Sequence, residues 1–375
     1  MISLFSIFSF LAVSFLSTAL ALTVDPTWTV SIHGGQIQHN ATRALSAFAL
    51  AKDLGARGVR SDIFWDEIRP SRNTTWDASK VDFYTQYFRE AGQVLGGSIV
   101  ILSGPPAWAK QLFQTNRTDF FAEWSAYLQK AIEIVGDSPV LAWQLWNEMN
   151  HVPSAWINTD QEAVCKIFNM AGEAVAKRSI KNLRGSHAPR FVNVMADDPN
   201  LPTVGLQGWR NALNRWLNTT HCAGSVIDGI GLDHYPGTWT LSRSLTDWSP
   251  LRELLDRVRV DKGAPGWQGK LPAVMETGFS TWNTVLAPES RQTAFCDQSL
   301  DTILAMLRSH HSQIHADASP SPIIVNFYQL IDEDTTSARG GIRSEVRARD
   351  RNNNGARSHL SVHLLPMPGV KELRT

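Results

Sequence analysis

Apolar and polar positions alternate along the chain in two patterns. Short, almost continuous apolar runs, typical of strands buried on both faces, are separated by longer segments with apolar residues at the helical period. The apolar runs predict eight strands, at residues 28–34, 58–65, 98–103, 140–147, 190–196, 226–233, 271–277 and 322–330. The segments between them predict seven helices, at residues 41–54, 78–95, 118–135, 160–181, 207–218, 248–260 and 288–310.

Repeated alternation of strand and helix is typical of a parallel sheet covered by helices. Because there are eight strands, we expect an α/β protein with a single-domain (β/α)8 TIM barrel; an open doubly wound sheet is the alternative. The chain has 375 residues, of which 43% are apolar, enough to bury one core of this size. We expect the barrel to occupy residues 22–336.

Both ends of the chain depart from this pattern. Residues 1–21 form an apolar run that ends in Ala19-Leu20-Ala21, which is typical of a signal-peptide cleavage site. We therefore expect a signal peptide over residues 1–21; an uncleaved anchor is the alternative, because the run lacks Lys and Arg. Residues 337–375 predict an irregular C-terminal segment, rich in Arg, Asn and Gly over residues 337–357, with room for a short last helix. A long loop, disorder and an error in the gene model all fit residues 337–357.

Glycosylation sequons and cysteines agree with a secretory route. Four N-x-[ST] sequons lie in polar stretches and predict N-glycans at Asn40, Asn73, Asn116 and Asn218. The three cysteines allow at most one internal disulfide. Cys165–Cys222 is favoured because both residues fall on neighbouring predicted helices, but pairings with Cys296 stay open. We expect a secreted, extracellular protein with no membrane segment after the leader.

The charge balance argues against one class of partner. The chain has 35 basic and 35 acidic residues, and no basic stripe interleaved with aromatic residues. A protein that binds a phosphate backbone needs such a positive field. We therefore expect no nucleic-acid partner.

Candidate chemistry begins at the end of the fourth predicted strand, in WQLWNEMNH, where Asn147 and Glu148 follow an apolar run. A second apolar run, KLPAVMETG, ends in Glu276, which lies 128 residues further on. That interval holds three strand–helix units of about 30 to 45 residues. Because barrel strands present their C-terminal ends at one mouth, both glutamates are expected there.

These residues resemble the retaining glycoside hydrolases of clan A, also called the 4/7 superfamily. The resemblance spans residues 28–334 and rests on Asn147-Glu148, Glu276, Arg60 in the second strand and Tyr235 after the sixth. Two segments are similar to conserved loops of member families: FWDEIRPSRNTTWD, residues 64–77, and GPPAWA, residues 104–109. The member family is not resolved.

The resemblance implies a double displacement on an oligo- or polysaccharide of the plant or fungal cell-wall type, with no cofactor and no metal ion. Glu148 would be the acid/base and Glu276 the nucleophile. Asn147 would hydrogen-bond the sugar 2-hydroxyl, and Arg60 and Tyr235 would hold Glu276 ionised. For Arg60, a buried ion pair with Asp62 on the same face is the alternative.

Two histidines are weaker candidates for substrate binding. His33, at the end of the first strand, is interpreted either as a sugar contact or as a core residue. His234 precedes Tyr235, whereas the clan often has His two positions before the Tyr, where this chain has Asp233. Because neighbouring strand residues point to opposite faces, His234 is equally well interpreted as a loop or core residue.

Aromatic residues near the strand ends are candidates for stacking on sugar rings. Trp108 is preferred, with Trp65 and Trp239 as further candidates, although most of the 14 tryptophans must belong to the core. On the eighth strand the clan usually places a Trp under the reacting sugar. This chain has Phe327-Tyr328 there, and Tyr328 is taken as a substrate-binding residue.

Two other functions stay open. A metal-dependent barrel hydrolase would need a cluster of His and carboxylates, often His-x-His on the first strand, and SIHGGQIQH offers no such pair. Insensitivity to chelators would separate the two enzymes. A catalytically impaired barrel that binds glycan is the alternative from another class, and the presence of both glutamates argues against it.

Overall fold

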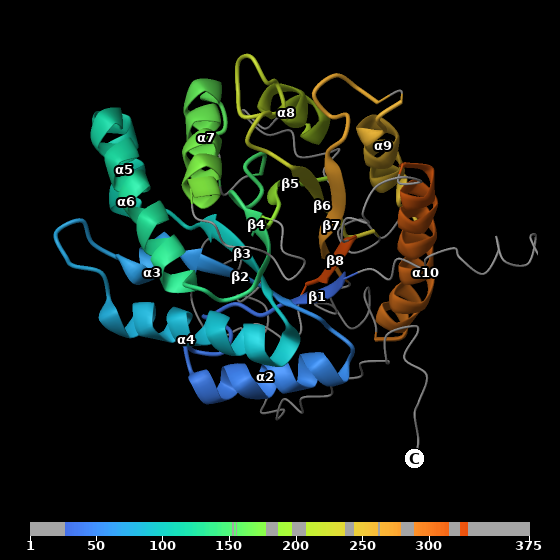
Figure 1. Ribbon diagram of the computed structural model, residues 1–375, viewed down its shortest axis with the longest axis horizontal. Helices are drawn as coiled ribbons and strands as arrows, with labels where there is room; N and C mark the ends of the chain where they lie inside the picture. Colours follow the sequence, from blue (N-terminus) through green and yellow to red (C-terminus); the bar gives the residue numbers. More distant parts are fainter. Residues whose placement is uncertain are drawn as a thin grey trace, which may run out of the picture.

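The chain forms a closed barrel of eight parallel strands in a ring of helices, as a computed structural model shows (Figure 1). The structure describes residues 27–151, 154, 156–177, 187–196, 208–236, 244–261, 263–278, 289–314 and 323–328. Each strand pairs with the next along the chain, and β8 pairs with β1 to close the barrel. The predicted (β/α)8 fold is confirmed, and the open sheet is excluded.

The elements lie close to their predicted positions. The strands are β1 Thr27–Ser31, β2 Val59–Phe64, β3 Ser98–Ser103, β4 Val140–Gln144, β5 Arg190–Met195, β6 Gly229–Asp233, β7 Leu271–Thr277 and β8 Ile324–Phe327. The helices, with the labels of Figure 1, are α2 Ala41–Asp53, α3 Trp65–Ile68, α4 Ala78–Leu95, α5 Ala107–Thr115, α6 Arg117–Val135, α7 Gln161–Lys177, α8 Trp209–Trp216, α9 Ser249–Val258 and α10 Glu289–Ile314. Two of them, α3 and α5, lie in loops to which the hydrophobic pattern assigns no helix.

Side-chain caps fix where several helices begin. Asn40, Asp77 and Asn116 precede α2, α4 and α6, and the side-chain oxygen of each accepts a hydrogen bond from a first-turn backbone N–H. The Asn218 oxygen likewise accepts from the backbone N–H of Thr220 and His221. All four sequon asparagines are exposed. In the three asparagines whose oxygen is engaged, the amide nitrogen that carries an N-glycan stays available.

Small residues on β6 decide what fills the barrel. Gly229, Gly231 and Asp233 alternate along the strand and share its inner face. A Cβ atom on Gly229 would lie 2.2 Å from the Phe191 ring, and one on Gly231 would lie 2.2 Å from Met275. The glycines therefore make room for these two large side chains, which belong to the apolar cluster inside the barrel. The next inward position on β6, Asp233, lies above that cluster.

A bulge in β7 places Glu276 beside Asp233. Leu232 pairs with Val274, but the next residue of β6, Asp233, pairs with Glu276, so Met275 is an extra residue in β7. A bulge re-aims the side chains that follow it and leaves backbone groups without a ladder partner. Here Asn326 Nδ2 on β8 donates to the Met275 carbonyl at 2.9 Å.

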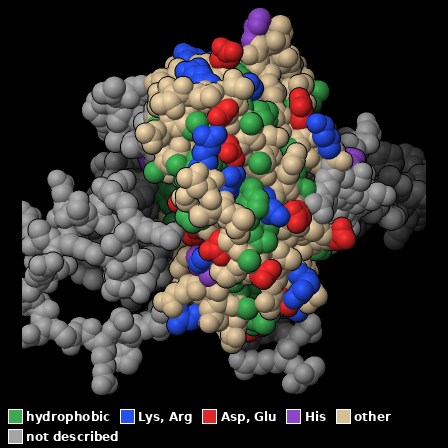
Figure 2. All heavy atoms as spheres, turned by 90° about the vertical axis from the view of Figure 1, so that its left-hand side faces the viewer, with side chains coloured by type: hydrophobic (Ala, Val, Ile, Leu, Met, Phe, Trp, Pro, Cys, Tyr) green, Lys and Arg blue, Asp and Glu red, His purple; other side chains and the backbone are tan. Residues whose placement is uncertain are grey.

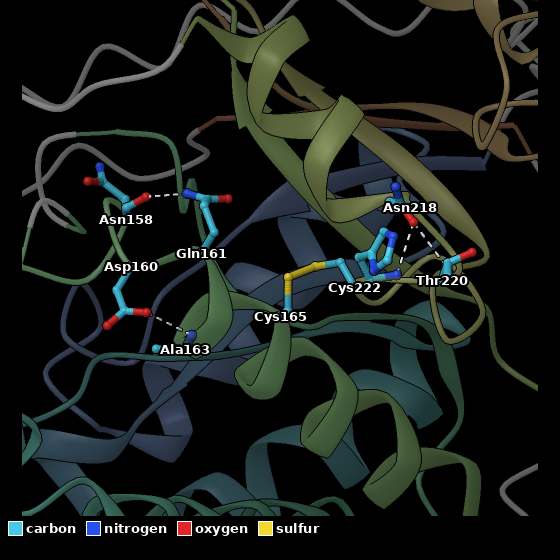
Figure 3. The surroundings of a disulfide bond; sticks show 9 residues. Asn158, Asp160, Gln161, Ala163, Cys165, Asn218, Thr220 and Cys222 are labelled. Atoms are coloured by element: carbon cyan, nitrogen blue, oxygen red, sulfur yellow. Dashed lines mark hydrogen bonds between the residues drawn. A yellow bond between two sulfur atoms is a disulfide. The ribbon is translucent and has the colours of Figure 1, made fainter.

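A disulfide joins two neighbouring helical regions. Cys165 on α7 is bonded to Cys222, which follows α8, with the two Cα atoms 4.9 Å apart (Figure 3). The favoured pairing of the sequence is thus confirmed. The side chain of Cys296 lies outside the described residues.

The predictions for both termini fall on parts of the chain that the structure does not describe. These are the signal peptide over residues 1–21 and the irregular segment over residues 337–375. Within the described residues, no helix has the length and apolar character needed to cross a membrane.

Charged side chains of both signs lie on one face of the molecule. Figure 2 shows the side on which α5 and α6 lie in Figure 1, and there Lys and Arg are mixed with Asp and Glu. Ion pairs on and next to α6, such as Arg72–Asp119 and Lys130–Glu133, likewise join opposite charges. The described residues on this face form no stripe of one sign that would suit a polyanion.

Candidate active site

Glu148 lies just beyond β4, in a turn whose backbone conformation differs from that of a strand. Its φ angle is 44°, the left-handed region that residues other than glycine rarely adopt, at a cost on the order of 1 kcal/mol. Its backbone N–H donates to Asn193 Oδ1 on β5 at 2.9 Å, and its carbonyl accepts from the His151 N–H at 2.8 Å. These bonds hold the turn, and Glu148 is buried at the barrel mouth, with 8% of the residue exposed.

Glu276, at the end of β7, has a partner on each carboxylate oxygen. Oε1 lies 2.6 Å from Arg60 Nη1, and Oε2 accepts from the Tyr235 hydroxyl at 2.5 Å. Burial raises the pKa of Glu276, the positive Arg60 lowers it, and the negative Glu148 raises it again, so that the pKa stays above its usual value. The ion pair and the hydroxyl favour the charged form against this burial.

Arg60 is the fixed positive charge of the site. It is wholly buried on β2, and burial alone would lower its pKa, but Glu276, Asp233 and Asp62 outweigh this effect and raise the pKa. Arg60 therefore stays charged. Among the described residues its ion-pair partner is Glu276. The direct Arg60–Asp62 pair considered from the sequence is not formed, because Asp62 is engaged by His33 and Ser103.

Asn147 is locked in place by its amide oxygen. Oδ1 accepts from Arg60 Nη2 at 2.8 Å, Gln144 Nε2 at 2.8 Å and Asn193 Nδ2 at 3.0 Å. An oxygen with three donors has little left for a ligand, so the Nδ2 hydrogens are what Asn147 can offer one. Asn147 thereby also links the turn that carries Glu148 to Arg60.

Three carboxyls meet at the mouth. Each of Glu148, Asp233 and Glu276 offers one oxygen, and these oxygens lie within 4.8 Å of one another. Burial, followed by the charges of Glu276 and Glu148, raises the pKa of Asp233 well above its usual value. The cluster is already balanced in part by Arg60, whose guanidinium occupies one Glu276 oxygen. A cation at this point would have to compete with that fixed charge.

His33 and Tyr328 form part of the wall around these groups. His33 Nδ1 lies 2.7 Å from Asp62 Oδ2, which fixes the plane of its ring. The Tyr328 ring lies 5.7 Å from the His33 ring and 6.3 Å from the Tyr235 ring. Phe327, the neighbour of Tyr328, instead stacks on Trp28 in the core. Tyr328, directly after β8, is thus the aromatic side chain that lies beside the site residues His33 and Tyr235.

Two residues considered from the sequence lie in the core, and a third, Trp108, is partly exposed. His234 is wholly buried, its Nε2 lies 2.6 Å from the Asp247 carbonyl oxygen, and its ring packs against Trp248, which favours the core interpretation. Trp65 has no exposed surface to offer a sugar, so its stacking role was wrong. Trp108 on α5 is half-buried, lies edge-on to Trp65, and donates to the Arg69 carbonyl at 3.3 Å. Trp239 falls outside the described residues.

Sequence reasoning assigned no role to Asp233 or Asn193. Asp233 shares the inner face of β6 with Gly229 and Gly231, so the strand alternation would have placed it in the barrel. Asn193 has the same signal, a polar residue inside the apolar run RFVNVM. It contacts Glu148, Asn147 and Asp233 at once, so it organises the site.

The arrangement combines two chemical capacities. Glu276 is a carboxylate held by a guanidinium and a hydroxyl, which suits it to act as a nucleophile. Glu148 has an oxygen within 4.8 Å of an oxygen of each other carboxyl, which suits it to exchange a proton.

Comparisons with known proteins give a likeness of fold. No protein-family model and no curated protein sequence matches this chain. Among solved structures, a family 5 glycoside hydrolase from Streptomyces cattleya, in complex with Manβ1-4GlcNAc, aligns with a TM-score of 0.57 at 15% identity, over 84% of this chain and 73% of that one. A family 1 β-glucosidase from Thermotoga maritima aligns with a TM-score of 0.51 at 12% identity, over 81% and 87%. An exo-β-1,4-mannosidase from an Opitutaceae bacterium gives 0.51 at 16% identity, over 81% and 51%. At such identities the match establishes the barrel fold that these proteins share with this chain.

Proposed function

We propose that this chain is a secreted retaining β-glycoside hydrolase that cleaves a cell-wall-type carbohydrate by double displacement. The observation that carries the proposal is the pair of carboxyls after β4 and β7, whose nearest oxygens lie within 4.8 Å. Retaining enzymes need carboxyl groups about 5 to 5.5 Å apart, whereas inverting enzymes need about 6.5 to 9.5 Å to admit a water. The ion pair on Glu276 supports its assignment as nucleophile, which leaves Glu148 as the acid/base.

In the first step Glu276 attacks the anomeric carbon as the glycosidic C–O bond breaks. Glu148 gives its proton to the leaving oxygen, and the sugar becomes an ester of Glu276. Glu276 loses its negative charge when it forms this bond. Arg60 and Tyr235 can then both donate to the ester's carbonyl oxygen. Asn147 Nδ2 donates to the sugar 2-hydroxyl, and that bond strengthens as charge develops.

In the second step Glu148 acts as a base. It takes a proton from a water, which attacks the anomeric carbon from the side that the leaving group has vacated. The C–O bond to Glu276 breaks, and the carboxylate returns to its ion pair with Arg60. Two inversions leave the product with the configuration of the substrate.

The substrate class rests on three supports. Several structural neighbours are β-glucosidases or β-mannosidases by name. The signal peptide predicted over residues 1–21 and four exposed sequon asparagines suit a glycosylated enzyme that meets its carbohydrate outside the cell. His33, Trp108 and Tyr328 remain proposed sugar contacts, and the Tyr328 ring lies 6.3 Å from the ring of Tyr235, which bonds Glu276.

A substrate panel tests the proposal. The secreted protein should hydrolyse at least one aryl β-glycoside or β-linked polysaccharide, should spare the α-linked counterparts, and should keep its rate after treatment with a chelator. A Glu148→Gln/Glu276→Gln double variant, purified in the same way, controls for contaminating activity. Inactivity on the whole panel would contradict the proposal. Activity that chelation abolishes would favour the metal-dependent hydrolase instead.

A further inference from the structure

Asp233 is a third carboxyl at the mouth, and the two-glutamate mechanism gives it no task. It is wholly buried at the end of β6, and one of its oxygens lies within 4.8 Å of oxygens of Glu148 and Glu276. On the basis of the proposed function, we propose that Asp233 and Glu148 share one proton, so that the acid/base is a pair of carboxyls. Asp233 is then a positioning residue that acts through Glu148.

The hydrogen bonds around the pair leave a place for this proton. Asp233 Oδ2 accepts from Asn193 Nδ2, and Glu148 Oε2 lies 3.4 Å from His151 Nδ1. Within the described part of the chain, Asp233 Oδ1 and Glu148 Oε1 are buried without a hydrogen-bond partner. Two ionised carboxylates have only acceptors, so neither can satisfy the other. One proton on either carboxyl turns an oxygen into a donor and removes the conflict.

The charges around the Asp233–Glu148 pair also favour one proton on it. Among the described residues, the titratable and charged groups that face the pair are Arg60 on β2, His151 beside Glu148, Tyr235 after β6 and Glu276 on β7. With all three carboxyls ionised, one guanidinium would face three buried negative charges. Burial raises the pKa of Asp233 well above its usual value, and the charges of Glu276 and Glu148 raise it further. Burial and like charge thus favour the state in which the pair holds one proton.

A shared proton also balances charge through the reaction. In the first step the pair gives its proton to the leaving oxygen and becomes doubly negative, while Glu276 loses its charge in the ester bond. In the second step a proton of the attacking water returns to the pair as the ester breaks. The total charge beside Arg60 is the same before and after each step, which spares the buried site a change in net charge.

The measurement is the pH dependence of kcat/KM for the wild-type protein and for Asp233→Asn. The wild-type basic limb reports loss of the shared proton, which creates two adjacent anions. Charges within 4.8 Å at an effective dielectric constant of about 20 repel enough to move that loss upward by roughly two pH units. Asp233→Asn removes the repulsion and offers an N–H to Glu148. We expect the basic limb to move to lower pH by at least about one unit.

Asp228→Asn is the matched control, because Asp228 precedes the same strand at its opposite end and pairs there with Arg190. It should leave the basic limb in place. If Asp233→Asn lowers activity at every pH with an unmoved basic limb, Asp233 is merely structural and the inference is overturned, while the proposed function stands.

A second readout is independent of activity. Infrared difference spectra should show a protonated carboxyl at neutral pH in the wild-type protein and in Asp228→Asn, and its loss in Asp233→Asn. This band decides the matter even if the wild-type protein hydrolyses no glycoside, an outcome that would overturn the proposed function alone. Absence of a protonated carboxyl from the wild-type protein at neutral pH would overturn the shared proton.

Discussion

Glu276→Ala is expected to lower turnover of the true substrate by at least about 1,000-fold, because it removes the group that forms the covalent intermediate. The change also takes the ion-pair partner from Arg60, a buried cation, and losing one partner of such a pair costs about 3 to 5 kcal/mol of stability. Glu276→Gln keeps an oxygen that can accept from Arg60, while its amide N–H faces the Tyr235 hydroxyl, so it should lose the activity with a smaller change in thermal unfolding. Circular dichroism of both variants separates lost chemistry from lost fold.

Azide tests whether Glu276→Ala lacks the nucleophile. The space vacated by the Glu276 side chain admits a small anion on the nucleophile's side of the sugar. With an aryl β-glycoside whose leaving group is good, azide should restore turnover and give the α-glycosyl azide, since a single displacement inverts the anomeric carbon. Near wild-type rates without azide would show that Glu276 is not the nucleophile.

Glu148→Ala should produce the opposite pattern. Substrates with poor leaving groups should lose roughly 100- to 10,000-fold, because their oxygen needs a proton in the first step. Substrates with good leaving groups should still form the ester with Glu276, and the intermediate should then accumulate because no base activates water. Azide needs no base, so it should release the sugar as the β-glycosyl azide.

The configurations of the two azide products distinguish the roles of Glu148 and Glu276 more clearly than the rates do. Retained configuration with Glu148→Ala and inverted configuration with Glu276→Ala place the two carboxyls on opposite sides of the anomeric carbon. The same configuration from both variants would contradict the assignment of separate roles. A loss of rate in Glu148→Ala that is the same for every leaving group would show that Glu148 does not donate the proton.

Much of the fold could be predicted because a parallel barrel repeats one signal. Apolar runs buried on both faces mark each strand, and capping residues such as Asn40 and Asp77 mark where helices begin. Helix α3 escaped prediction because four residues carry too little periodicity for an amphipathic pattern, and α5 because it begins within GPPAWA, which the resemblance assigns to a loop.

The positions of the site residues follow less directly from the sequence. The order of the strands brings Asn147, Glu148 and Glu276 to one mouth, and this could be predicted. The bulge at Met275 could not, because no residue type marks it, and yet it sets Glu276 beside Asp233. The positive φ of Glu148 likewise depends on Asn193, which reaches it from the next strand.

Alternation along β6 shows what a residue-by-residue comparison with a family leaves out. His234 drew attention because it adjoins Tyr235, but it lies on the outer face, against Trp248. The inward residue is Asp233, which replaces the histidine expected at that place and adds a charge to the site. The strand's period of two, applied before the resemblance, favours Asp233 over His234.

The anomeric configuration of the first product tests the central claim most directly. The wild-type protein is mixed with the β-glycoside that the panel identifies, and proton NMR follows the sugar before mutarotation. The account predicts that the β-anomer appears first and the α-anomer only later, because oxygens of Glu148 and Glu276 lie within 4.8 Å of each other, closer than the carboxyl separation of inverting enzymes. An α-anomer that appears first would mean a single displacement, and would contradict both the nucleophile role of Glu276 and the retaining mechanism.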